Sequence, residues 1–129
     1  MVKIILIAHG GMARAMLETA AKIYPFDINS VDVFTVSGNV DLQQLSGEIR
    51  QKADQRGTLI MVDVFGGTAC NIPAAATQGM GNVNVVCGLN LNMLLSALSN
   101  RGTLTAAALA RKVLEDGVKG MLNATEKLK

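Results

Sequence analysis

The segment Val2-Lys3-Ile4-Ile5-Leu6-Ile7-Ala8-His9-Gly10-Gly11 decides the fold of this chain. Its first seven residues form a nearly continuous apolar run rich in isoleucine, which is typical of a strand buried on both faces. His9 and the two glycines end this strand. Apolar residues then recur at helical spacing up to Pro25, which cannot continue a helix. A buried strand followed at once by an amphipathic helix predicts the first half of a βαβ unit.

The same alternation continues along the rest of the chain. We expect further strands over residues 31–36, 58–63 and 83–87, and helices over residues 12–24, about 41–53, a short stretch through 74–76, 91–98 and 104–122. This spacing predicts an α/β fold, a doubly wound, mainly parallel sheet with helices on both faces. Crossovers must be right-handed, and the simplest doubly wound strand order is 2-1-3-4. No repeat or linker interrupts residues 1–129, so we expect a single domain.

Composition and charge exclude several classes of protein. Half of the residues are hydrophobic, only 3% are aromatic, and the formal net charge is +2. No run of Lys and Arg lies beside aromatic residues, which argues against a nucleic-acid binder. No stretch reaches the roughly 18 apolar residues of a membrane span, and none resembles a signal peptide. We therefore expect a cytoplasmic protein without direct membrane insertion.

The few metal-binding side chains are also informative. Cys70 and Cys87 lack the spacing of metal ligands, and the single histidine cannot complete a zinc site with them. In a cytoplasmic protein these thiols stay reduced. The sequence therefore predicts no metal and no cofactor.

Two polar residues follow the strands that flank the predicted switch in strand order. In open α/β sheets, ligands bind beyond the carboxyl ends of the strands at this switch. His9 follows the first strand and Asp63 ends the third. If these strands are neighbours, Asp63 can accept a hydrogen bond from one ring nitrogen of His9 and leave the other nitrogen free to react. The alternative is a histidine and a solvated acid that merely end their strands.

His9 suits the chemistry of a reversible carrier. A neutral imidazole nitrogen is nucleophilic near pH 7, and a phosphorylated ring remains a good leaving group. Gly10 and Gly11 place no side chain beside the ring, so the phosphohistidine of another protein can approach closely.

A second glycine pair follows Asp63. Gly66 and Gly67 precede a predicted helix, whose first N–H groups and dipole favour an anion. Thr68 can cap this helix, donate its hydroxyl to a bound phosphate, or do both.

These residues carry a resemblance to a known family. The segment Ile7-Ala8-His9-Gly10 resembles the active-site start of the mannose-type IIA components of the sugar phosphotransferase system. The segment 59–71, LIMVDVFGGTACN, is similar to their second signature, in which an aspartate precedes Gly-Gly-Ser/Thr and an asparagine follows. Weaker similarity covers residues 37–39, 88–94 and 116–119, so the resemblance spans most of the chain in the same order.

The resemblance implies a function and a set of partners. His9 is then the phosphorylated residue, Asp63 orients its ring, and Thr68 with the amides of Gly66 and Gly67 holds the phosphoryl group. Members are cytoplasmic homodimers that accept phosphate from the histidine-containing phosphocarrier protein and pass it to a IIB component for sugar uptake, without metal or nucleotide. We expect the IIB partner to be a separate chain. Helices rich in alanine and leucine also favour an apolar face covered by a second copy.

Three alternatives remain to be weighed. A regulatory phosphoacceptor, which signals its phosphorylation state without sugar transport, would use the same His9 chemistry. A phosphocarrier of the dihydroxyacetone-kinase type shares the fold and the histidine, but the loop from Asp63 to Thr68 fits the mannose type better. A nucleotide-binding or hydrolytic enzyme is disfavoured, since the chain has no Walker loop, no G-x-G-x-x-G after the first strand and no G-x-S-x-G elbow.

Overall fold

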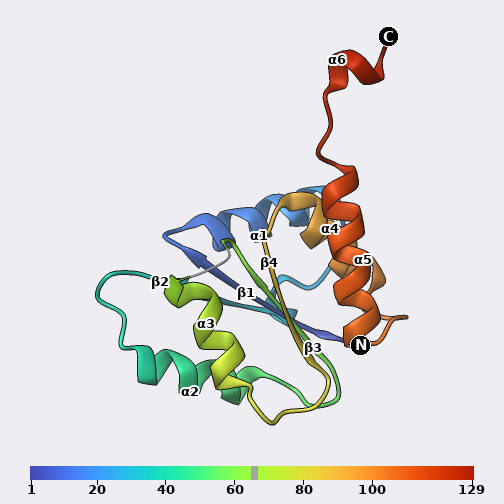
Figure 1. The fold of residues 1–129 in the computed structure, drawn as a ribbon. Coiled ribbons are helices and arrows are strands. Elements are labelled where there is room, and N and C mark those ends of the chain that lie inside the picture. Colours follow the sequence, from blue (N-terminus) through green and yellow to red (C-terminus); the bar gives the residue numbers. More distant parts are fainter. Residues whose placement is uncertain (65–66) are drawn as a thin grey trace.

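The computed structural model describes residues 1–64 and 67–129, and for residues 67–70 the helical backbone alone. The elements, drawn in Figure 1, are β1 (Lys3–His9), α1 (Met12–Ile23), the 3-10 helix η1 (Ile28–Ser30), β2 (Val31–Val36), α2 (Leu42–Lys52), β3 (Thr58–Val62), α3 (Gly67–Ala76), β4 (Val83–Cys87), α4 (Leu91–Asn100), α5 (Ala106–Lys119) and α6 (Ala124–Lys127). Strands and helices alternate as far as α4.

The four strands form one sheet in the order β2-β1-β3-β4. All three strand pairs are parallel, and Ile7 of β1 lies opposite Phe34 of β2 and Val62 of β3. The predicted α/β fold and the predicted strand order 2-1-3-4 are therefore confirmed. The order places β1 and β3 side by side in the centre of the sheet, where Ile7 and Val62 are Cα partners.

Helices cover both faces of the sheet, as Figure 1 shows. Successive side chains of β1 point to opposite faces, so that Ile4 and Leu6 belong to one core cluster and Ile5 and Ile7 to the other. The first cluster includes buried residues of α1, α4 and α5, and the second includes buried residues of α2 and α3. Burial on both faces explains why the strand segments are almost wholly apolar.

Short polar side chains fix where several helices begin. Asp41 accepts hydrogen bonds from the main-chain N–H groups of Gln43 and Gln44 at the start of α2. Asn90 caps α4, and Thr105 caps α5 in the same way. Each such cap stabilises its helix by about 1 kcal/mol.

Several helix boundaries differ from the predicted ones. Helix α3 begins at Gly67, so Thr68 is the second residue of the helix and not the residue before it, where a capping side chain stands. Helix α5 ends at Lys119 instead of residue 122, with Gly120 as its C-cap. The following segment leaves the body of the domain and ends in α6, as Figure 1 shows. Among the described residues, no helix combines the length and apolar character needed to cross a membrane.

Candidate functional site

The structure brings His9 and Asp63 together at the carboxyl edge of the sheet. His9 is the last residue of β1, and Asp63 directly follows β3. These strands are parallel neighbours, so their carboxyl ends lie side by side. His9 and Asp63 are far apart in sequence, and it is the position of β1 next to β3 in the sheet that brings them together, as predicted.

Asp63 holds His9 at two points. Its Oδ2 atom lies 2.9 Å from Nδ1 of the His9 ring and accepts the main-chain N–H of His9 at 3.0 Å. Its Oδ1 atom accepts the main-chain N–H of Val64 at 2.9 Å. The Asp63 side chain is only 5% exposed, whereas the His9 side chain is 54% exposed. A buried, fixed carboxylate thus orients a ring that remains accessible to other molecules.

The electrostatics of the pair favour an ionised Asp63. Burial works to raise the pKa of the carboxyl, but the hydrogen bonds from the main chain and ring of His9 and from the main chain of Val64 outweigh it. The pKa of Asp63 is therefore held below its ordinary value. An ionised carboxylate only accepts hydrogen bonds, so Nδ1 is the ring nitrogen that carries the proton. The lone pair of the neutral ring is then on Nε2.

Gly10 has a structural reason to be glycine. Its φ of +58° lies in the left-handed region, where a side chain is strained. This conformation turns the chain from β1 into α1 immediately after His9. The turn leaves His9 at the surface instead of under the following helix.

The predicted phosphate-binding residues are only partly described. Gly66 lies outside the described residues, and so does the side chain of Thr68. The backbone of Gly67 and Thr68 forms the first turn of α3, which follows Asp63 after a short connection. The first turn of a helix has N–H groups without intrahelical partners, which suit an anion.

Sequence reasoning missed the main-chain part of this site. The bonds from Asp63 to the N–H groups of His9 and Val64 fix the backbone as well as the ring. An aspartate directly after a buried strand was the available signal, since such a side chain often bonds to nearby main-chain groups.

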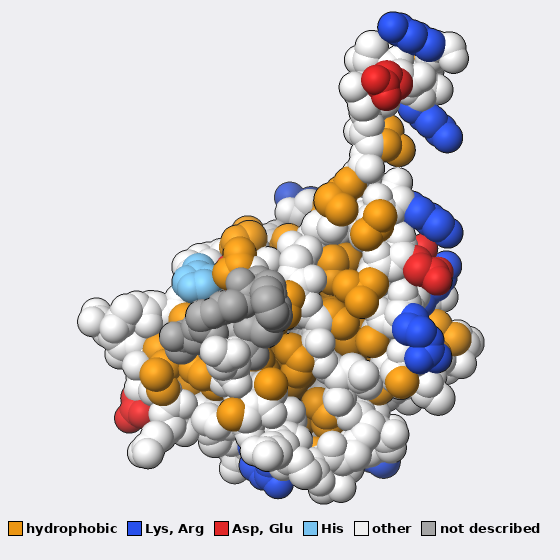
Figure 2. Space-filling view, viewed as in Figure 1, with side chains coloured by type: hydrophobic (Ala, Val, Ile, Leu, Met, Phe, Trp, Pro, Cys, Tyr) orange, Lys and Arg blue, Asp and Glu red, His pale blue; other side chains and the backbone are white. Residues whose placement is uncertain are grey.

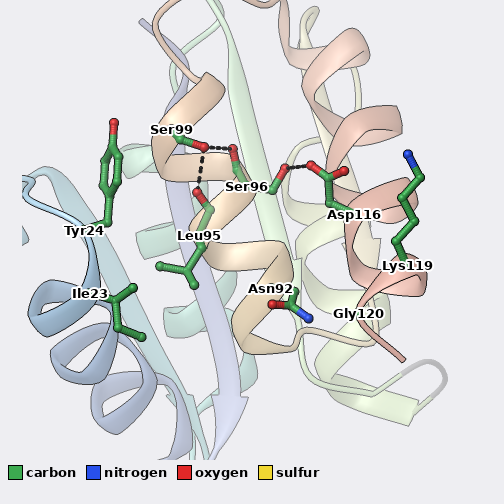
Figure 3. A pocket seen from close by; sticks show the side chains of 9 residues that line it. All are labelled: Ile23, Tyr24, Asn92, Leu95, Ser96, Ser99, Asp116, Lys119 and Gly120. Carbon is green, nitrogen blue, oxygen red and sulfur yellow. Dashed lines mark hydrogen bonds between the residues drawn. The ribbon is translucent and has the colours of Figure 1, made fainter. Parts of the chain in front are cut away.

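A separate hollow of about 430 Å³ lies beside α4, and Figure 3 shows its lining. Ser96 donates a hydrogen bond to Asp116 at 2.6 Å, and this bond, followed by the contact with Lys112, lowers the pKa of Asp116. These polar groups satisfy one another, and neither His9 nor Asp63 lines the hollow. Among the side chains that the structure describes, no group of three or more His, Cys, Asp and Glu could hold a metal ion.

The fold and the site define a class: a doubly wound α/β protein with an exposed histidine held by a buried carboxylate at the switch in strand order. Comparison with known proteins gives the family. The family model EIIA-man, described as "PTS system fructose IIA component", matches residues 3–114. The chain belongs to this family, the mannose-type IIA components of the sugar phosphotransferase system, and its class of activity is phosphoryl transfer.

Individual relatives agree with the family. The chain is 29% identical to the fructose-specific EIIA component of Bacillus subtilis over 104 residues, which cover 78% of this chain and 71% of that protein. It is 27% identical to the sorbose-specific EIIA component of Lacticaseibacillus casei, over 88% of this chain and 83% of that protein. The crystal structure of an EIIA component from Streptococcus agalactiae has the same fold, with a TM-score of 0.88, 24% identity and coverage of 98% and 99% of the two chains.

Proposed function

We propose that His9 is the phosphoryl carrier of this IIA component and that Nε2 is the nitrogen that carries the phosphoryl group. The observation that supports this most directly is the 2.9 Å contact between Nδ1 and Asp63, because it occupies one nitrogen of a ring whose side chain is 54% exposed and leaves the other nitrogen available. The lone pair of Nε2 attacks phosphorus, a P–N bond forms, and the bond between phosphorus and the donor nitrogen breaks. The electron pair of the broken bond returns to the donor ring.

The donor in this proposal is the histidine-containing phosphocarrier protein, and the acceptor is a IIB component. Both are proteins that the family implies, and both transfers use the same nitrogen of His9. We propose that residues 1–129 act as one domain and that two copies form a homodimer. Transfer onward to a IIB component would distinguish a transport role from the regulatory one.

The remaining site residues have supporting roles in this proposal. Asp63 keeps Nδ1 protonated and stabilises the positive charge that develops on the ring during transfer. The amides of Gly66 and Gly67 and the hydroxyl of Thr68 hold the phosphoryl oxygens. The position of Thr68 in the first turn of α3 supports this role, since phosphate groups bind at helix N-termini.

The test is an intact-mass measurement after incubation with phosphoenolpyruvate, enzyme I and the phosphocarrier protein. We expect one added phosphate per chain, and none when the phosphocarrier is omitted. Phosphorus and proton NMR of the product should then place the phosphate on Nε2. Phosphate on Nδ1 would contradict the role given to Asp63, and an unchanged mass would contradict the proposed function.

A further inference from the structure

One buried arginine lies at the end of the sheet opposite His9. Arg101 is the C-cap of α4, and its carbonyl group accepts the main-chain N–H of Val2, directly before β1. β1 then runs to His9, which places the two ends of this strand about 20 Å apart. Figure 1 marks the N-terminus beside the start of α5, and Figure 2 shows the histidine on the other side of the same view. Arg101 is therefore remote from the proposed phosphoryl carrier.

The side chain of Arg101 is buried without a close counter-ion. Only 7% of the residue is exposed, and its guanidinium group forms no hydrogen bond or ion pair with the residues that the structure describes. Burial lowers the pKa of Arg101, and the nearby oxygens of Tyr24 and Asp27 counteract only part of this effect. The guanidinium group nevertheless stays protonated. A buried charge without a partner costs free energy, and a bound anion would offset that cost.

The position of Arg101 at a helix end explains its charge but not its burial. The helix dipole favours a positive charge near the C-terminal end of a helix, and an exposed side chain is sufficient for this. Lys119, in the last turn of α5, is exposed in this way. The burial of the Arg101 side chain therefore needs a further explanation.

Arg101 lines two neighbouring hollows at this end of the sheet. The larger has a volume of about 500 Å³ and is also lined by Arg56 and Ala106. The smaller has a volume of about 270 Å³ and is also lined by Tyr24. Pockets that hold small molecules have volumes of about 300–1,000 Å³, so the larger hollow has the size of a ligand site.

The first turn of α5 adds hydrogen-bond donors to the larger hollow, which it borders at Thr105 and Ala106. Thr105 accepts the main-chain N–H of Ala108. The N–H groups of Ala106 and Ala107 bond to no residue that the structure describes. Such N–H groups, together with the dipole of a helix of 14 residues, favour an anion.

The acidic side chain that lines the larger hollow is already paired. Asp54 contacts Arg56 at 2.8 Å, and hydrogen bonds from Arg56 lower the pKa of Asp54 to about 2. This ion pair has no net charge. Arg101 and the first turn of α5 therefore give the hollow an excess of positive charge.

We propose that the hollow between Arg101 and the first turn of α5 binds a phosphate group, either free or carried by a small organic molecule. A guanidinium group can bind two phosphate oxygens through parallel N–H···O bonds. The N–H groups of α5 can bind a further oxygen. A phosphate group suits donors from two separate elements better than a carboxylate, which has only two oxygens. This site is separate from His9 and does not depend on the function proposed for that residue.

The test is an NMR titration of the main-chain amides with inorganic phosphate and with glucose 6-phosphate, each at constant ionic strength. We expect the signals of Gly102, Ala106 and Ala107 to shift and to saturate at millimolar concentrations. Glucose alone should leave these signals unchanged. Tighter binding of glucose 6-phosphate would indicate an organic phosphate as the ligand, whereas equal or weaker binding would indicate free phosphate.

Three variants test the role of Arg101. Arg101→Gln removes the charge, and we expect it to weaken binding about tenfold or more, because hydrogen bonds between charged groups are strong. Arg101→Lys keeps the charge but cannot form two parallel bonds, so its affinity should lie between those of Arg101→Gln and wild type. Arg111→Gln removes an exposed charge of α5 and is the matched control, with an affinity within about twofold of wild type.

Several results would overturn this inference. One is the absence of saturable shifts with both phosphate compounds. Another is a set of shifts confined to the amides of Gly10 and Gly67, which would place the anion beside His9. Wild-type affinity in folded Arg101→Gln or, where that variant does not fold, in Arg101→Lys would show that the guanidinium group does not bind the anion. None of these results bears on phosphorylation of His9, so the two proposals can fail separately.

Discussion

At the scale of single residues, one carboxylate organises the site. Asp63 accepts three hydrogen bonds, two from His9 and one from Val64, while its side chain stays almost fully buried. The arrangement fixes both the backbone and the ring of His9. Loss of the Asp63 carboxylate should therefore slow phosphoryl transfer more than the loss of a group that contacts only the phosphoryl oxygens.

We predict that Asp63→Asn slows phosphate transfer from the phosphocarrier by about tenfold or more, because an amide can select the wrong tautomer and stabilises a cationic ring poorly. Thr68→Ala should have a smaller effect. The measurement is the transfer rate for each variant beside wild type. Asp41→Asn is the matched control, since either residue caps α2 well. Wild-type speed in Asp63→Asn would show that Asp63 is only a strand end.

The same carboxylate predicts a dependence of stability on pH. The pKa of Asp63 is lowered in the folded state from its ordinary value of 3.8, so its ionised form stabilises the fold above that pH. This contribution is lost as the pH falls below 3.8 through the lowered pKa. The difference in unfolding free energy between wild type and Asp63→Asn, about 1–3 kcal/mol near pH 7, should shrink over that range. A difference in unfolding free energy that does not change with pH would contradict a lowered pKa of Asp63 in the folded protein.

Part of this site could be predicted from the sequence. His9 and Asp63 each follow a buried strand, and the strand order predicts that they meet. Which carboxylate oxygen bonds to which N–H group depends on the local turn after β3, and an apolar pattern does not encode that turn.

At the scale of elements, glycines distinguish tight helix packing from open helix surface. Gly117 of α5 packs against α4, where an added Cβ would lie 2.6 Å from Cγ of Met93. A Cβ on Gly47 of α2 would meet no described atom. We therefore expect a glycine-to-alanine substitution to change the stability of the protein in opposite directions in these two helices.

We expect Gly117→Ala to destabilise the protein by about 1–3 kcal/mol through overpacking. Gly47→Ala should stabilise it by about 0.5–1 kcal/mol, because alanine favours the helix. Denaturant unfolding of both variants measures the two changes. Stabilisation by Gly117→Ala would show that Met93 yields without cost and that the contact between α4 and α5 is loose.

Helix ends were less predictable than helix positions. Apolar spacing indicates α5 well, but it does not show that the helix ends at Lys119. Asn123 caps the separate helix α6 and accepts the N–H of Thr125, so the chain is divided where the apolar residues Met121 and Leu122 suggested continuity. Local capping contacts outweighed the helical pattern there.

At the scale of the whole molecule, apolar side chains remain uncovered near the C-terminal end. They are Leu114, Val118, Met121, Leu122 and Leu128, all more than two fifths exposed. Figure 1 shows the segment after α5 standing away from the rest of the fold. Exposed apolar surface of this kind marks sites of association.

We therefore predict a homodimer. Sedimentation at micromolar concentration should show a species of about twice the chain mass of 13.5 kDa. Substituting Val118 and Met121 with aspartate should shift the equilibrium toward monomer, whereas the same change at Leu42, an exposed residue of α2, should not. A wild-type protein that sediments only as monomer would contradict the prediction.

The central claim is that His9 carries the phosphoryl group, and His9→Ala tests it most directly. His9 is exposed at the end of β1, so the variant should fold, with a circular dichroism spectrum close to that of wild type. The measurement is the intact mass of both proteins after incubation with phosphoenolpyruvate, enzyme I and the phosphocarrier protein. The account predicts one added phosphate on wild type and none on the folded variant. A folded His9→Ala protein that still gains a phosphate would contradict it.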